Sequence, residues 1–293
     1  MTRPLATLVL FLHILALFAR SLAVAHPPRH GTRNDHTPRV PQGLLGGLLG
    51  DVGSLAEYLG EMGDVVAEVA KALADGNPGQ GDYGGAGCKD VMVIFAKGTT
   101  ESNTIGDTVG PAFLNATLKA LANFDPATTL SFKGVPYPAD FLGFFEGGSP
   151  EGSAAMAYML QNVTAQCPSA PLVAVGYSQG GQIVHNAAQI LAAHDPSVLT
   201  HIKAVVIFGD PDEKQALPNE IPPATIDEIC HSGDVVCGSA GKDVGYGSVP
   251  RLGLLLATPF IGLTLPQHLN YQNQTEMDDA ARFVVRMVFG ESA

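Results

Sequence analysis

A motif for a reactive serine lies near the middle of the chain. Residues 176–180 read Gly-Tyr-Ser-Gln-Gly, which matches the Gly-x-Ser-x-Gly turn that holds a nucleophilic serine between a strand and a helix. The context fits, because an apolar run at 172–175 precedes the motif and a helical pattern at 179–193 follows it. We therefore predict that Ser178 is the nucleophile of an acyl-transfer reaction, against the alternative of a surface serine in an ordinary glycine-rich turn.

The serine needs two partners further along the chain. A histidine must take its proton, and an acid must orient that histidine. Hydrolases with this turn carry them in the order serine, acid, histidine. The histidines after Ser178 are His185, His194, His201, His231 and His268. The first two lie on the helix after the motif and the third precedes a strand, so we predict His268 as the base. His231, the alternative base, is interpreted as a loop residue without a catalytic part.

The acid is expected in a short segment bounded by two cysteines. Asp234 lies between Cys230 and Cys237, and a disulfide there would clamp the loop that carries the carboxylate. Asp210 and Asp212, which follow a strand, are the alternative acids. Because Asp210 stands in a Gly-Asp-Pro sequence, it is interpreted as a turn cap. We predict Asp234 as the acid.

Two groups are expected to stabilise the negative charge that develops on the substrate's carbonyl oxygen. One is the backbone amide of Gln179, the residue after the nucleophile. The other comes from the loop after the first strand, Ala-Lys-Gly-Thr-Thr-Glu at 96–101, in which Thr99 offers an amide and a hydroxyl. The alternative interpretation is that Thr99 has no catalytic part and is an ordinary threonine at the end of a strand.

Alternating apolar runs and helical patterns indicate the elements that position these residues. We expect strands at 91–96, 130–135, 172–175 and 204–208, and helices at 111–123, 153–162, 179–193 and 276–289. The strand runs are apolar throughout, as in parallel strands buried on both faces. The prediction is a three-layer α/β fold of the α/β-hydrolase type, with a short parallel sheet between helices and Ser178 at its carboxyl edge.

The start of the chain has the features of an export signal. It combines Arg3, an apolar run and the small residues Ala-Val-Ala at 23–25. The run is shorter than the roughly 20 residues of a membrane-spanning helix. We expect residues 1–25 to be a signal peptide and the protein to be secreted, without a transmembrane anchor.

The rest of the chain divides into two parts. Residues 26–85 are interpreted as a propeptide or N-terminal extension, in which apolar positions from Val52 onward indicate an amphipathic helix. Residues 86–293 are expected to form one catalytic domain. The chain has 28 acidic and 16 basic residues and a net charge of −12, which disfavours nucleic acid as a partner. We expect a monomer.

Four cysteines in an exported chain are expected to pair. Three pairings are possible, but the short separation of Cys230 and Cys237 favours a local disulfide, which leaves Cys88 with Cys167. No cysteine or histidine spacing typical of a metal site is present, and we expect no metal. The candidate glycosylation sites, each in an Asn-x-Thr sequence, are Asn115, Asn162 and Asn273.

Taken together, four segments resemble the cutinase and acetylxylan esterase family of small secreted serine esterases. They are residues 96–101, Cys167-Pro168, 175–181 and 230–237. The resemblance extends from about Cys88 to the C-terminal helix. It implies a short parallel sheet between helices, an open active site without a large cap, and no cofactor.

The resemblance also implies roles for individual residues. Ser178 matches the family's nucleophile, Asp234 its acid and His268 its base. Thr99 and Gln179 match the oxyanion donors, with Thr99 at a position where relatives often have serine. The two cysteine pairings also match those of the family.

The sequence departs from the family pattern before His268 and at the start of the chain. The stretch between Cys237 and His268 is longer than in compact relatives and contains an apolar run at 252–261. This run is interpreted either as a hydrophobic flap that docks acyl chains or as a buried element that covers the core. The extension before Cys88 could cover the active site, bind a partner or be removed on maturation.

The function expected from these features is ester hydrolysis through a serine, histidine and aspartate. The apolar run favours cutin-type polyester or esters of short to medium acyl chains as the substrate. Within the same class, the alternative is an acetylxylan esterase that removes acetyl groups from plant cell-wall xylan. A different class, a secreted binding protein without catalysis, would not need all three of Ser178, Asp234 and His268.

Overall fold

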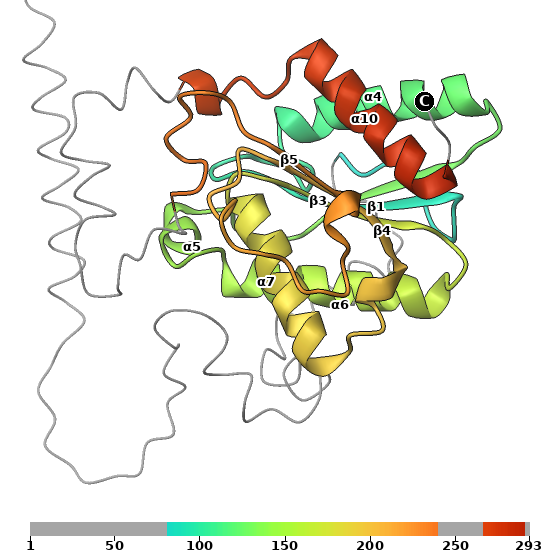
Figure 1. Ribbon diagram of the computed structural model, residues 1–293, viewed down its shortest axis with the longest axis horizontal. Helices are drawn as coiled ribbons and strands as arrows, with labels where there is room; N and C mark the ends of the chain where they lie inside the picture. Colours follow the sequence, from blue (N-terminus) through green and yellow to red (C-terminus); the bar gives the residue numbers. More distant parts are fainter. Residues whose placement is uncertain (1–80, 240–265, 291–293) are drawn as a thin grey trace, which may run out of the picture. The chain divides into compact units, whose positions relative to one another are not determined.

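The computed structural model describes residues 81–239 and 266–290, which Figure 1 shows in colour. Five parallel strands form one sheet in the order β2-β1-β3-β4-β5. The strands are β1 (Val91–Ala96), β2 (Leu130–Gly134), β3 (Leu172–Tyr177), β4 (Ile202–Phe208) and β5 (Ile226–Ile229). The α-helices are α4 (Val109–Phe124), α5 (Phe141–Phe145), α6 (Pro150–Gln166), α7 (Gln179–His194) and α10 (Gln274–Phe289), and two 3-10 helices are η2 (Leu199–His201) and η3 (Pro223–Thr225).

Helices cover both faces of the sheet. In Figure 1, α4 and α10 lie on one side and α6 and α7 on the other. Successive side chains of β1 enter opposite cores: Val93 packs on the side of α4 and α10, and Ile94 on the side of α6 and α7. Because both faces are buried, the central strands carry apolar residues without alternation. The predicted three-layer α/β architecture is confirmed.

The predicted elements agree with the structure to within a few residues, and one strand, one α-helix and the two 3-10 helices were missed. β1 has the predicted bounds, whereas β3 continues two residues beyond the predicted end to Tyr177. β5 was missed because it is a short edge strand whose middle residues, Asp227 and Glu228, give it no apolar run. α5 was missed because its five residues are too few for a helical period to emerge.

Two residues on the N-terminal side of the predicted boundary between residues 85 and 86 contact the edge of the sheet. Tyr83 pairs with Phe132 of β2 in an antiparallel bridge, through N–H···O contacts of 2.9 and 3.0 Å. The carboxylate of Asp82 accepts hydrogen bonds from the amide of Gly134 and the hydroxyl of Thr104. Residues 82 and 83 are therefore attached to the edge of the sheet at β2.

Several sequence predictions lie outside the described residues. They are the signal peptide at 1–25, residues 26–80 of the extension predicted at 26–85 with its expected helix from Val52, and the apolar run at 252–261. Among residues 81–239 and 266–290, no helix has the length and apolar character that a membrane crossing requires.

Candidate active site

Ser178 lies in a sharp turn at the carboxyl edge of the sheet, between β3 and α7. Its φ of 57° is in the left-handed region, which costs a residue with a side chain on the order of 1–3 kcal/mol. Hydrogen bonds hold the turn, with the Ser178 amide donating to the Phe208 carbonyl at 2.9 Å and the Gly181 amide donating to the Ser178 carbonyl at 2.8 Å. The strained serine is thus fixed by the neighbouring strand and by its own helix.

The flanking glycines are required by close packing. A Cβ atom on Gly176 would lie 2.4 Å from the carbonyl oxygen of Gly180. A Cβ atom on Gly180 would lie 1.9 Å from the carbonyl oxygen of Ala96, at the end of β1. Side chains at either position would push the turn away from the sheet, which is the physical reason for the glycines of the motif.

The structure brings Ser178, His268 and Asp234 together. His268 Nε2 lies 2.8 Å from Ser178 Oγ, and His268 Nδ1 lies 2.7 Å from Asp234 Oδ2. All three residues are buried, between 5% and 8% exposed. With its Nδ1 proton donated to the carboxylate, the imidazole presents the lone pair of Nε2 to the serine hydroxyl. This is the geometry in which a histidine can take the serine proton.

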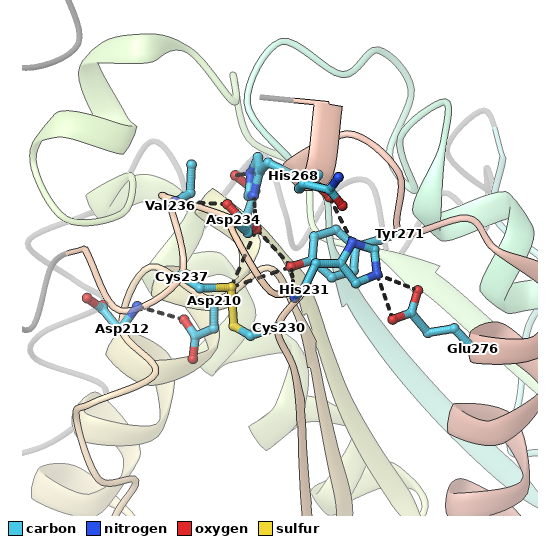
Figure 2. Close-up of a disulfide and its surroundings, with 12 residues drawn as sticks. Asp210, Asp212, Cys230, His231, Asp234, Val236, Cys237, His268, Tyr271 and Glu276 are labelled. Carbon is cyan, nitrogen blue, oxygen red and sulfur yellow. Dashed lines mark hydrogen bonds and ion pairs between the residues drawn. A yellow bond between two sulfur atoms is a disulfide. The ribbon is translucent and has the colours of Figure 1, made fainter. Parts of the chain in front are cut away.

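Asp234 is held as a carboxylate by its hydrogen bonds (Figure 2). Burial by itself would raise the pKa of Asp234, but donors from His268, the Val236 amide and the Tyr271 hydroxyl outweigh it and lower that pKa. The disulfide between Cys230 and Cys237 closes the loop around the carboxylate. The acid therefore keeps its charge and its orientation in a largely dry environment.

His268 is positioned by contacts from β3 and β4. The hydroxyl of Tyr177 donates to the carbonyl of His268 at 3.0 Å, and the two rings stack with their centroids 5.6 Å apart. Gly209, directly after β4, has a φ of +59°, and a Cβ atom there would lie 2.8 Å from the imidazole. The absence of a side chain at residue 209 lets the ring of His268 approach the end of the sheet.

The two expected oxyanion donors, Thr99 and Gln179, lie side by side. Gln179 begins α7, so its backbone amide belongs to the first turn of the helix, where amides have no partner within the helix. Its side-chain Nε2 donates to Thr99 Oγ1 at 3.0 Å and to the Asp140 carbonyl at 2.7 Å. Since Thr99 Oγ1 accepts from Gln179, the proton of the threonine hydroxyl is free to point to another acceptor.

A half-buried carboxylate, that of Glu101, shapes the loop that carries Thr99. Glu101 accepts hydrogen bonds from the backbone amides of Gly98, at 2.7 Å, and Thr108, at 2.9 Å. On the other side of Thr99, the Thr100 amide donates to the Ala139 carbonyl at 2.7 Å. The loop is therefore pinned on both sides of Thr99, which fixes the direction of its amide and hydroxyl.

The alternative histidines and acids are engaged elsewhere. His231 contacts the carboxylate of Glu276 at 2.8 Å and the Gln267 carbonyl at 2.8 Å. Asp210 caps its turn as predicted, accepting from the Asp212 amide at 2.8 Å. His201 Nδ1 lies 3.0 Å from the Ser197 carbonyl, and His194 ends α7.

Sequence reasoning missed a second buried histidine–aspartate pair. His185 Nε2 lies 2.9 Å from Asp210 Oδ2, and both residues are buried. Burial lowers the pKa of His185, but the hydrogen bond and charge of Asp210 outweigh it, so the pKa is raised. The only signal in the sequence was the place of His185 on the buried face of α7, beside Ala188.

The same pair could contribute to a metal site. His185, Asp210 and Glu228 place their potential ligand atoms within 4.8 Å of one another. However, His185 and Asp210 already contact each other directly, so the burial of the two side chains does not require a metal ion. Burial and the charge of Asp210 raise the pKa of Glu228 to about 7, so this carboxyl takes up a proton easily.

Exposed apolar side chains stand next to the site residues in the chain. Phe141 and Leu142 follow Asp140, whose carbonyl contacts Gln179, and they are 57% and 64% exposed. Val235 follows Asp234, and Leu269 follows His268. These four residues are called the apolar rim below.

The predicted disulfides are present, and the three asparagines are placed as follows. Cys88 is bonded to Cys167, and Cys230 to Cys237. The asparagines of the Asn-x-Thr sequences are exposed on α4 (Asn115), half-buried on α6 (Asn162) and exposed at the N-cap of α10 (Asn273).

Comparisons with known proteins agree on one family. The family model described as Cutinase matches residues 87–246, a range that includes Ser178 and Asp234 and ends before His268. A cutinase of Botryotinia fuckeliana is 47% identical over 51% of this chain and 70% of its own length. A cutinase of Hypocrea jecorina is 34% identical over 80% of this chain and 87% of its own.

A solved structure extends the similarity to almost the whole of another chain. It is a Trichoderma reesei cutinase in complex with a C11Y4 phosphonate inhibitor, with 32% sequence identity. The alignment covers 80% of this chain and 98% of that chain, with a TM-score of 0.55. Sequence and structure thus point to the same relatives.

Proposed function

The chain belongs to the cutinase family of carboxylic ester hydrolases, and we propose that Ser178, His268 and Asp234 carry out its ester hydrolysis. The single observation that carries this proposal is the continuous chain of contacts from Ser178 Oγ through His268 to Asp234 Oδ2, 2.8 and 2.7 Å long. A binding protein with the same fold would have no need for a buried, aligned set of this kind.

The reaction proceeds in two steps. His268 Nε2 takes the proton of Ser178 as Oγ bonds to the ester carbonyl carbon, and the imidazolium then gives that proton to the leaving alcohol. A water molecule next loses its proton to His268 and attacks the acyl-serine, which releases the carboxylic acid and restores the serine hydroxyl. Asp234 remains a carboxylate throughout and stabilises the imidazolium in each step.

The oxyanion of each tetrahedral intermediate is stabilised by donors from two elements. The backbone amide of Gln179 lies at the start of α7, where the helix dipole also favours negative charge. Thr99 adds its amide and its hydroxyl proton, since its oxygen already accepts from the Gln179 side chain. Donors fixed before substrate arrives need no reorganisation as the charge forms.

Cutin-type polyester, or an ester of a short to medium acyl chain, is the substrate class that the apolar rim favours. Leu142 and Leu269 are 64% and 58% exposed and follow site residues closely in the chain, and such surface gains free energy by leaving water. An acetyl group is too small to cover this area. Acetylxylan esterase activity is the second candidate, because the segment Val-Gly-Tyr-Ser-Gln-Gly-Gly at 175–181 resembles both branches of the family.

A comparison of substrates separates the two candidates. Initial rates are measured on p-nitrophenyl esters from acetate to palmitate, and on cutin and acetylated xylan as suspensions. A maximum at butyrate or longer chains, with monomers released from cutin, supports the polyester substrate. A rate confined to acetate, with acetate released from xylan, would replace it by the acetylxylan substrate.

Secretion is part of the proposal. Two disulfides in the described residues fit an oxidising compartment, and insoluble plant polyester is met only outside the cell. Expression of the full chain with an epitope tag at its C-terminus tests this, with the tagged protein expected in the culture medium. Retention of the protein in the cells would contradict it.

A further inference from the structure

Tyr271 makes a direct contact with the acid of the proposed triad. It lies three residues after His268 and is fully buried. Its hydroxyl donates to Asp234 Oδ2 at 2.8 Å and accepts from the His231 amide at 2.9 Å (Figure 2). The phenol therefore shares Oδ2 with the imidazole of His268, whose Nδ1 lies 2.7 Å from the same oxygen.

The phenol is a permanent donor in this position. Burial, followed by the nearby charge of Asp234, raises the pKa of Tyr271 far above its ordinary value, so the hydroxyl keeps its proton throughout the working pH range. Because the His231 amide occupies its acceptor side, the hydroxyl proton is directed to the carboxylate. The remaining oxygen, Oδ1, accepts from the Val236 amide at 2.8 Å.

A second layer fixes the ring of Tyr271. The imidazole of His231 stacks on it with a centroid distance of 4.0 Å and an interplanar angle of 12°. His231 is itself held at both nitrogens, by Glu276 on α10 and by the Gln267 carbonyl, each at 2.8 Å. Figure 2 shows this series from Glu276 through His231 and Tyr271 to Asp234. Helix α10 is thus connected to the acid by side chains alone.

We propose that Tyr271 is a positioning residue for ester hydrolysis, which holds the Asp234 carboxylate ionised and aligned with His268. The inference rests on the proposed roles of Ser178, His268 and Asp234, and it adds the hydroxyl of Tyr271 to this set of groups. A tyrosine that only filled the core would serve through its ring, and its hydroxyl would face the backbone or water. Here the hydroxyl faces the one carboxylate oxygen that orients the base.

The proposal predicts a change in the pH profile. The groups that face Asp234 are His268, Tyr271 and the Val236 amide, with the uncharged disulfide sulfur of Cys237 at 3.4 Å. The hydrogen bond from Tyr271 is one of the contacts that lower the pKa of Asp234. Removal of the phenol donor makes the carboxylate more basic, so we expect the acid limb of the pH profile to move to a higher pH.

The test compares Tyr271→Phe with Tyr137→Phe. Tyr137 is a matched control, because it is also buried and its hydroxyl donates to a backbone carbonyl, that of Lys97, away from Asp234. We measure kcat/KM for p-nitrophenyl butyrate between pH 4 and 9 and the melting temperature of each variant. Tyr271→Phe is expected to lower kcat/KM about tenfold at pH 7 and to move the acid limb up by roughly half to one pH unit. Tyr137→Phe is expected to lose stability with its acid limb unmoved.

A second measurement covers the case in which Tyr271→Phe does not fold. Incorporation of 3-fluorotyrosine keeps the size of the ring and makes each tyrosine a stronger hydrogen-bond donor. The acid limb of the fluorinated wild-type protein is expected to move to lower pH, the opposite direction. The hydroxyl of Tyr177 contacts the His268 carbonyl, a group that does not titrate, and so does not account for this movement.

The outcomes separate this inference from the proposed function. Turnover that depends on Ser178, with an acid limb that stays in place in Tyr271→Phe or in the fluorinated protein, overturns the role of Tyr271 and leaves the triad intact. Absence of Ser178-dependent turnover in the unmodified protein overturns the proposed function itself.

Discussion

The hydroxyl oxygen of Ser178 lies 2.8 Å from Nε2 of His268, although 90 residues separate them in the chain. The serine reaches this position because its φ of 57° turns the side chain out of the crowded end of β3. The histidine reaches it because Gly209 leaves room for its ring and Tyr177 holds its carbonyl. The contact thus depends on the packing of two strand ends, those of β3 and β4.

Asp234→Asn is expected to retain the fold and to lose most of the activity. The amide keeps the shape of the side chain but presents a neutral group to His268, which then adopts the wrong tautomer and cannot accept the proton of Ser178. We expect kcat to fall by about 10³ to 10⁴ with little change in KM. Steady-state kinetics on p-nitrophenyl butyrate measure both, and a fall below tenfold would argue against Asp234 as the acid.

Thr99→Val tests the oxyanion donor. Valine has nearly the same shape, but it has no hydroxyl to donate, so kcat is expected to fall by about 10- to 100-fold. Thr117→Val is the matched control, because Thr117 is fully buried on α4 and its hydroxyl donates only to the Phe113 carbonyl. A threonine hydroxyl that serves structure alone would give both variants the same small loss of melting temperature and an unchanged kcat.

The double variant Leu142→Ser with Leu269→Ser tests the apolar rim. Loss of apolar surface is expected to reduce kcat/KM on octanoate esters by about tenfold, while the acetate ester, which has no chain to bury, changes by less than about twofold. Phe124→Ser on α4, where the ring is 37% exposed, is the control for general effects of a lost surface side chain. Equal losses on acetate and octanoate would show that the rim does not select the acyl chain.

The pair of His185 and Asp210 is expected to make stability depend on pH. A histidine whose pKa is raised in the folded state stabilises the fold fully below its unfolded pKa of about 6.5, and this contribution is lost as the pH rises through the folded value. The neutral double variant His185→Gln with Asp210→Asn lacks this pH-dependent contribution to stability. The stability of wild type relative to this variant is therefore expected to be greatest near pH 6 and to decline toward pH 9.

Urea unfolding at a series of pH values measures this difference. Glu228→Gln is introduced into both the wild-type protein and the double variant, because the pKa of Glu228, about 7, would add a titration in the same pH range. The single variant His185→Gln leaves Asp210 buried without its partner and is expected to cost about 3–5 kcal/mol. A relative stability that does not change with pH would contradict a charged pair.

The elements that position the site were predictable because their physical signals are local. β1 and β3 are buried on both faces, so their residues form continuous apolar runs, and α7 repeats its apolar residues at helical spacing. The prediction of Ser178 as the nucleophile came from five consecutive residues. The predictions of Asp234 and His268 required only the order of residues along the chain and the proximity of two cysteines.

The contacts that support the proposed triad could not be predicted in the same way. Tyr271 and Asp234 are 37 residues apart, and their hydrogen bond depends on the direction of two side chains in the folded protein. The contact between His185 and Asp210 joins the buried face of a helix to the end of a strand. Neither relation leaves a spacing rule in the sequence, since each is set by how α7, β4 and the segment after His268 pack.

Covalent labelling of Ser178 is the most direct test of the central claim. A p-nitrophenyl alkylphosphonate should react with Ser178 Oγ at phosphorus and release p-nitrophenolate, leaving a stable adduct. Peptide mass spectrometry is expected to find one adduct per chain, on Ser178, formed in proportion to the loss of esterase activity and absent in Ser178→Ala. An adduct on another residue, or full loss of activity with Ser178 unmodified, would contradict the account.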